Sequence, residues 1–174
     1  MEVELHQLLL RYERLRKRHP RMERTLLASL AEIGQQTPVV VVREAERFVL
    51  IDGYKRVRAL RRLARDVVVA TRWELEEVEA LLLERGLRRG SEDALDQAWL
   101  LTELQERFGY SLDELARRFA HSKSWVSSRL ALIQCLPEPV QEHVRLGALS
   151  AHAAMKYLVP LARNDLQIAT RFAT

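Results

Sequence analysis

The sequence predicts an α+β domain followed by an all-α domain. Two β-branched runs in the first half, VVVV after Pro38 and VVVAT at residues 67–71, alternate with helical patterns. Short apolar runs bounded by turn residues are typical of buried strands, whereas apolar positions spaced three and four apart indicate helices. No strand pattern follows residue 90, so we place the domains at 1–90 and 91–174.

The first domain is expected to contain a small sheet with helices. Leucines at helical spacing predict a helix over residues 3–18, which Pro20 would end. Gly34 is placed to cap the C-terminus of the next helix. A glycine-punctuated basic loop is expected over residues 85–90. The other expected elements are helix 22–33, strand 39–42, strand 48–51, helix 54–65, strand 67–71 and helix 74–84.

Residues 111–132 predict a helix-turn-helix within the second domain. Ser111 and Glu114 have the spacing of a capping box. In this motif the serine hydroxyl accepts a hydrogen bond from the glutamate N–H, and the glutamate carboxylate accepts one from the serine N–H. Ser122 is placed to cap the second helix of the pair. Further helices are expected over residues 92–108, 138–146 and 151–161.

The second helix of this pair is predicted to be apolar on one side and polar on the other. The residues on the inner side are Trp125, Val126, Leu130 and Ile133. Serine hydroxyls can contact phosphates and base edges, and arginine can contact guanine. A solvated helical hairpin is the alternative interpretation. The candidate DNA-binding residues are Ser122, Lys123, Ser124, Ser127, Ser128 and Arg129.

Composition permits a polyanionic partner and excludes several site classes. Lys+Arg 28 against Asp+Glu 24 gives a net charge of +4, and the arginines are clustered in three runs. The lone Cys135 cannot form an intrachain disulfide or a thiolate metal site. No apolar run is long enough to span a bilayer and no signal peptide is evident, so a cytoplasmic location and no membrane partner are predicted.

Gly53 lies between an expected strand and a basic helix, where a phosphate could bind. Glycine lets backbone approach a ligand closely, and a helix N-terminus attracts anions. Lys55, Arg56 and Arg58 would add positive charge. A basic surface helix without a ligand is the alternative interpretation.

Two further segments are expected to form parts of the same site. The loop from Gly34 to Pro38 would oppose the Gly53 turn, and the segment from Gly86 to Gly90 would close it. A carboxylate such as Glu84 among arginines can hold a metal–phosphate complex, or can form a surface ion pair of little energetic value.

The order of these motifs is similar to that of the ParB family of chromosome- and plasmid-partition proteins. LLASLAEIGQQTPVVVV, FVLIDGYKRVRALRRL, a strand, an acidic helix and the helix-turn-helix follow one another over roughly residues 22–162. The resemblance implies a ParB-like nucleotide-binding domain and a helical DNA-binding domain. It also implies CTP and Mg²⁺ as cofactors, double-stranded DNA and a partition ATPase as partners, a homodimer, and a nucleoid- or plasmid-associated location.

The family motifs map onto particular residues of this chain. Glu84 falls at the position expected for a magnesium ligand and catalytic carboxylate. The family's Gly-Glu-Arg-Arg is Gly-Tyr-Lys-Arg here, and Arg85 replaces an asparagine that helps to hold the metal. A cation there repels Mg²⁺, which argues against robust CTP hydrolysis. The nucleotide-binding residues implied by motif and charge are Gly34, Pro38, Gly53, Tyr54, Lys55, Arg56, Arg58, Arg88 and Arg89.

Three functional hypotheses follow. The first is a sequence-specific DNA-binding protein for DNA partition or plasmid maintenance, regulated by CTP. The second is a helix-turn-helix transcription regulator or adaptor whose nucleotide pocket does not function. The third is a nucleotide hydrolase or phosphotransferase with Glu84 as its catalytic carboxylate. The family's separate C-terminal dimerisation domain is not found before Thr174, which suits either a fragment or a shorter relative.

Overall fold

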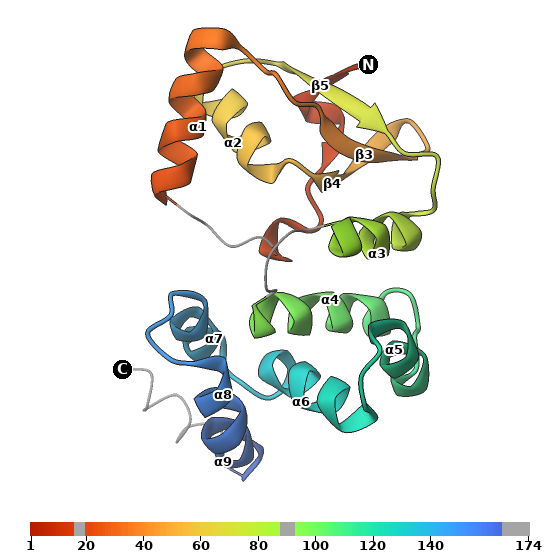
Figure 1. Ribbon diagram of the computed structural model, residues 1–174, viewed down its shortest axis with the longest axis vertical. Coiled ribbons are helices and arrows are strands. Elements are labelled where there is room, and N and C mark those ends of the chain that lie inside the picture. The colour runs from red at the N-terminus through yellow and green to blue at the C-terminus, as the bar shows by residue number, and fades with distance from the viewer. Residues whose placement is uncertain (16–19, 88–92, 165–174) are drawn as a thin grey trace. The chain divides into compact units, whose positions relative to one another are not determined.

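The computed structural model describes residues 1–15, 20–87 and 93–164. The chain divides into two compact units, Met1–Arg89 and Gly90–Thr174. In Figure 1 the first unit contains both strands and helices, whereas the second contains helices. The predicted fold class, α+β followed by all-α, is confirmed.

The described part of the first unit forms a five-stranded sheet in the order β1-β5-β3-β4-β2. The central strand β3 pairs antiparallel with β4 and parallel with β5. At the edges, β1 pairs antiparallel with β5, and β2 pairs parallel with β4. The strands are β1 (Glu2–Glu4), β2 (Leu8–Leu9), β3 (Val39–Glu44), β4 (Arg47–Asp52) and β5 (Val67–Arg72).

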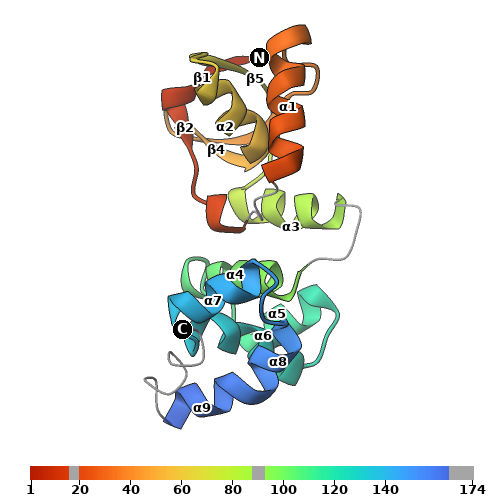
Figure 2. The same cartoon turned by 90° about the vertical axis from the view of Figure 1, so that its left-hand side faces the viewer.

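Two helices of the first unit, α1 (Pro20–Ile33) and α2 (Tyr54–Arg62), pack against each other (Figures 1 and 2). Helix α2 also contacts β5, and α3 (Glu77–Leu87) contacts β4. The continuous apolar runs of β3 and β4 are buried between these elements, as expected for strands covered on both faces. The buried residues of these two strands are Val39, Val41, Val42, Val49, Leu50 and Ile51.

The predicted helix over residues 3–18 is wrong for the residues described. Residues 2–15 instead contain the short strands β1 and β2 and two 3-10 turns, η1 (Leu5–Gln7) and η2 (Glu13–Leu15). Each strand pairs with an edge of the sheet, and the Leu5 N–H donates to the Asp66 carbonyl at 2.7 Å. Pairing with distant strands therefore outweighs the local helical spacing.

The segment after β5 also differs from prediction. Helix α3 begins at Glu77 rather than near residue 74, and it continues through Arg85 and Gly86 to Leu87. Residues 85–87, expected in a loop, are therefore the last turn of a helix. The remainder of that predicted loop lies outside the described residues.

Helices of the second unit pack around an apolar cluster. Helix α4 packs against α6, and α5 against α6. The core gathers side chains from α4, α6, α7 and the C-terminal helical segment, including Leu95, Leu132 and Val140. None of the helices described in either unit is long and apolar enough to cross a membrane. The helices are α4 (Ala94–Glu106), α5 (Leu112–Phe119), α6 (Lys123–Gln134) and α7 (Glu138–Arg145).

The predicted helix over residues 151–161 is formed, but it contains a wide turn. It consists of α8 (Ala151–Ala153), a π-helical turn η3 (Ala154–Leu158) and α9 (Val159–Asn164). The Val159 N–H donates to Ala154, five residues earlier. Pro160 supplies a physical reason, because it has no N–H and its ring would clash with the carbonyl four residues before it in a regular α-helix.

Gly53 is required by the geometry of the turn from β4 to α2. Its φ of 107° lies in the left-handed region. A Cβ built on Gly53 would lie 2.4 Å from Cγ1 of Val39, which is fully buried in the central strand. Glycine is therefore explained at this position by packing as well as by backbone conformation.

We predict that Gly53→Ala destabilises the first unit. The left-handed backbone alone costs about 1–3 kcal/mol for a residue with a Cβ, and the clash with Val39 adds to that cost. Gly86→Ala is the matched control, because a Cβ there meets nothing within 4 Å inside α3. In this control the free energy of unfolding should rise by about 0.5–1 kcal/mol, because alanine is favoured over glycine within a helix. Urea unfolding followed by circular dichroism measures both, and equal stabilities would contradict the prediction.

Candidate nucleic-acid interface and phosphate-binding turn

The helix-turn-helix is built as the capping residues predict. The Ser111 N–H and hydroxyl each donate to the Glu114 carboxylate at 2.8 Å, and the Glu114 N–H donates to the Ser111 hydroxyl at 3.3 Å. The bond from the Ser111 N–H, followed by the bond from the Ser111 hydroxyl, lowers the pKa of the Glu114 carboxyl group. Helix α5 ends at Phe119, and the next residue, Ala120, turns the chain sharply with a φ of 54°. Ser122 caps α6 by accepting from the Trp125 N–H at 3.1 Å.

The inner side of α6 is only partly as predicted. Val126 and Leu130 are buried. Trp125 is half-buried and lies at the rim of the core, where its ring stacks on His121 with centroids 3.8 Å apart. Phe119 lies behind it at 6.4 Å. Trp125 thus seals the turn between the two helices rather than filling the centre of the core.

The outer side of α6 is polar and borders a groove. Lys123, Ser124, Ser127 and Ser128 are exposed, and all four line a groove of about 430 Å³. The Ser128 hydroxyl donates to the Ser124 carbonyl at 2.8 Å, one turn earlier. The structure therefore brings together four of the six candidate DNA-binding residues, and Ser122 adjoins them as the cap.

Arg129 lies elsewhere, contrary to the prediction that it faces outward. Its Nε donates to Oε1 of Gln97 on α4 at 3.0 Å, and its Nη1 donates to the Met155 sulfur on η3 at 3.0 Å. The guanidinium also lies over the Trp125 ring, 4.9 Å from the centroid. Burial lowers the pKa of Arg129, and the Asp93 carboxylate opposes that effect. Arg129 joins α4, α6 and η3.

In the first unit, the two segments predicted to oppose each other do meet. Nη1 of Arg56 donates to the Pro38 carbonyl at 3.0 Å, which ties the start of α2 to the loop before β3. Gln35 fixes that loop, because its side chain donates to the Val69 carbonyl at 2.7 Å and accepts from the Val69 N–H at 2.8 Å. Gly34 ends α1 with a φ of 74°, as its predicted capping role requires.

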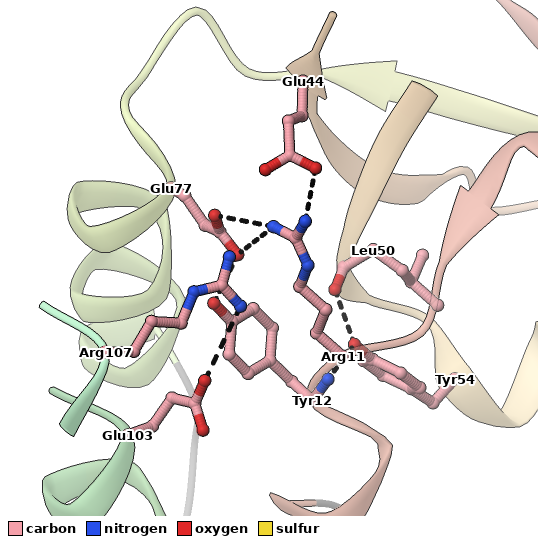
Figure 3. A network of polar contacts seen from close by, with 8 residues as sticks. All are labelled: Arg11, Tyr12, Glu44, Leu50, Tyr54, Glu77, Glu103 and Arg107. Atoms are coloured by element: carbon pink, nitrogen blue, oxygen red, sulfur yellow. Dashed lines mark hydrogen bonds and ion pairs between the residues drawn. The ribbon is translucent and has the colours of Figure 1, made fainter. Parts of the chain in front are cut away.

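Tyr54 is a core residue rather than a surface residue of this turn. Its side chain is 3% exposed, and its hydroxyl donates to the Leu50 carbonyl at 2.6 Å. The same hydroxyl accepts from the Tyr12 N–H at 3.1 Å. Figure 3 shows that this contact anchors the N-terminal segment beside β4. The Tyr54 ring therefore does not extend toward a ligand at the protein surface.

The network in Figure 3 continues from Tyr12 to α3. The Tyr12 hydroxyl donates a hydrogen bond to Glu77. The Glu77 carboxylate also accepts from Nη1 of Arg11, at 3.1 Å to Oε1 and 3.0 Å to Oε2. Nη2 of Arg11 donates to Glu44. The hydrogen bond to Glu44, followed by the interactions with Glu77, raises the pKa of Arg11. Residues of β3, α3 and the N-terminal segment are thereby held together.

Arg58 likewise has a structural role. Its Nη2 lies 2.5 Å from a Glu23 carboxylate oxygen, and its Nη1 lies 3.2 Å from Glu13. Its side chain is 13% exposed. The positive charge predicted for phosphate binding is therefore balanced by two carboxylates. Lys55 and Arg56 remain the half-exposed cations at the start of α2.

Glu84 lies on α3 and its residue is 7% exposed, so it is largely closed to solvent. The described residues contain no group of three histidine, cysteine, aspartate or glutamate side chains that could hold a metal ion. Arg88 and Arg89, the other predicted members of this site, lie outside the described residues.

Comparison with known proteins identifies the family. Residues 92–172 match the model of the ParB HTH domain. The chain is 30% identical over 152 residues to a probable chromosome-partitioning protein ParB of Mycobacterium leprae, covering 82% of this chain and 44% of that protein. The chain belongs to the ParB family. It spans about half the length of the curated ParB relatives it matches.

One solved structure, the Pnob8-like ParB-N domain, shares the fold of this chain. The Pnob8-like ParB-N domain has a TM-score of 0.52 and 18% identity, with 89% of this chain and 77% of that chain covered. The C-terminally truncated ParB of Caulobacter crescentus, complexed with CTP-γ-S, has a TM-score of 0.44 and 22% identity, covering 100% of this chain and 98% of that chain.

The sequence does not predict the wall of the groove that lies opposite α6. Met155, Val159 and Arg163 line it, and they come from η3 and α9. Local patterns predict a helix for Met155 and Val159 but do not indicate which element that helix faces, and Arg163 lies beyond the predicted end at residue 161. The spacing of Trp125 and Arg129 by one helical turn was the one available signal that both share a side of α6.

We predict that Arg129→Ala destabilises the second unit by about 1.5–3 kcal/mol, because a half-buried charged hydrogen bond is lost. Arg145→Ala is the control, since Arg145 forms only an i,i+3 pair with Glu142 at 3.0 Å, worth roughly 0–1 kcal/mol. Urea unfolding followed by tryptophan fluorescence measures both variants. An Arg129→Ala protein with normal stability and lost DNA-sequence preference would instead restore the base-contact role.

Proposed function

We propose that this ParB-family chain binds double-stranded DNA through α6, in the service of chromosome or plasmid partition. The main support is the outer face of α6, where Lys123 and three serines are exposed together. Helix α6 contains no acidic residue. A helix of this kind suits the major groove, where hydroxyls and cations contact phosphates and base edges.

The partners proposed with this function follow from the family. A homodimer would place two copies of α6 on a two-fold symmetric site, as dimeric helix-turn-helix proteins do. A partition ATPase is the second proposed partner, and association with the nucleoid or a plasmid is the proposed location. The Mycobacterium leprae relative is described as a probable chromosome-partitioning protein, which supports this choice of process.

We predict that Ser127→Asp weakens DNA binding at least about tenfold, because a carboxylate on α6 would face the phosphates. Thr25→Asp is the control, since it adds the same charge at an exposed position on α1; its affinity should stay within about twofold. Fluorescence anisotropy with a site selected from random duplexes measures the effect over a range of salt. The logarithm of affinity should fall with log salt by about 0.9 per neutralised phosphate. Absence of salt-dependent binding to any duplex would refute the function.

The proposal extends to a nucleotide at the start of α2. Its support is the approach of Arg56 to the Pro38 loop, together with Lys55 and the N-terminal end of α2. CTP would supply a triphosphate whose negative charge these groups attract. Tyr54 and Arg58 have structural partners, so Lys55 and Arg56 would be the principal side-chain contacts. The described residues contain no group of three histidine, cysteine, aspartate or glutamate side chains for a metal ion, so Mg²⁺ would be held largely by the triphosphate and water.

Calorimetry tests this extension. Lys55→Ala with Arg56→Ala should reduce CTP affinity at least about tenfold, since two charged contacts are lost. Arg61→Ala with Arg62→Ala, which removes equal charge from exposed positions of the same helix, should have little effect. Titrations with and without Mg²⁺, and with the other three nucleoside triphosphates, establish metal dependence and base preference. No binding of any nucleotide would favour the alternative of a helix-turn-helix regulator or adaptor.

The hydrolase alternative has less support. A general base must come within hydrogen-bond reach of the attacking water, whereas Glu84 is largely closed to solvent on α3. Arg85, on the same turn of α3, adds a positive charge that disfavours a metal ion.

A further inference from the structure

The groove beside α6 has two walls from different parts of the second unit. One wall is the outer face of α6, and the other comes from η3 and α9. Its volume of about 430 Å³ falls in the range of about 300–1,000 Å³ typical of ligand clefts. The lining residues are Leu112, Lys123, Ser124, Ser127, Ser128, Ala131, Met155, Val159, Pro160 and Arg163.

The chemistry of this lining suits an anion joined to an apolar body. Lys123 and Arg163 are cations from opposite walls, and none of the described residues that line the groove is acidic. Met155, Val159 and Pro160 supply apolar surface between them. A sugar–phosphate backbone combines an apolar sugar ring with a charged phosphate, so it matches both parts of this lining.

Of the two cations that line the groove, Lys123 forms an ion pair, whereas Arg163 forms none with the described residues. Lys123 Nζ lies 2.5 Å from the Asp113 carboxylate, and Arg145 on α7 pairs with Glu142. Arg163 is exposed, and no carboxylate among the described residues forms an ion pair with it. Its guanidinium is therefore available to a phosphate, which arginine binds with good geometry.

The dimensions of DNA also favour a phosphate contact from α9. The major groove is about 12 Å wide and admits one helix, so a phosphate backbone must pass on each side of that helix. With α6 in the major groove, α9 stands where one of those backbones would pass, because α9 and the outer face of α6 line the same groove.

We propose that one strand of bound DNA lies in this groove with its sugar–phosphate backbone, and that Arg163 contacts a phosphate from the wall opposite α6. This inference rests on the proposed DNA-binding function. It makes α9 part of the interface and assigns Arg163 a contact that adds affinity without sequence preference.

The test compares Arg163→Ala, Arg163→Glu and the control Arg145→Ala, using the selected site and a random duplex at several salt concentrations. Arg163→Ala should weaken binding to both duplexes about three- to tenfold, the loss of one hydrogen-bonded contact. Its salt slope should be smaller in magnitude by about 0.9. Arg163→Glu should weaken binding further, and Arg145→Ala should change neither quantity. Circular dichroism confirms that each variant is folded.

The outcomes separate this inference from the proposed function. If the unaltered chain binds no duplex, the DNA-binding function itself fails. If the unaltered chain binds with a normal salt slope and Arg163→Ala matches it in affinity and slope, the groove assignment alone is overturned. If Arg163→Ala weakens binding only to the selected site, Arg163 contacts a base and the phosphate assignment is wrong.

Discussion

The second unit depends on one guanidinium held where three helical elements meet. Arg129 bonds Gln97 on α4 and Met155 on η3, and it covers the ring of Trp125 on its own helix. A charge that is partly removed from water needs such partners, so its burial restricts how α4, α6 and η3 can be arranged. The exposed face of α6 and the opposite wall of the groove are positioned by the same contact. Arg129 therefore helps to set the positions of both walls of the groove.

The first unit is also held together by polar side chains, here tyrosine hydroxyls and arginine–carboxylate pairs. Two tyrosine hydroxyls and two arginines connect the N-terminal segment to the sheet, α1 and α3. Partly buried ionic groups are costly unless their hydrogen bonds are satisfied, so each such cation here is matched by carboxylates. As a result, two residues that were candidates for nucleotide binding, Tyr54 and Arg58, stabilise the fold. The positive charge at the start of α2 is correspondingly reduced.

How much the sequence predicts depends on whether the deciding interaction is local. The capping box at Ser111, the strands after Pro38 and the turn at Gly53 all follow from residues a few positions apart, and they are predicted correctly. The helix predicted for the N-terminal segment is wrong because the strands of that segment form by pairing with β5 and β4. The predicted outward orientation of Arg129 is wrong for the same reason, because its partners lie 26 and 32 residues away. Side-chain partners across a fold leave little trace in local spacing.

The wide turn at Ala154–Leu158 has a consequence for the C-terminal helix. A π-turn holds one residue more than an α-turn, so every later side chain is rotated by about 100° around the helix axis relative to an uninterrupted α-helix. The azimuth of Arg163 is thus set by Pro160, three positions before it. A chain in which this turn closed to regular α-helix would present a different residue of α9 to the groove.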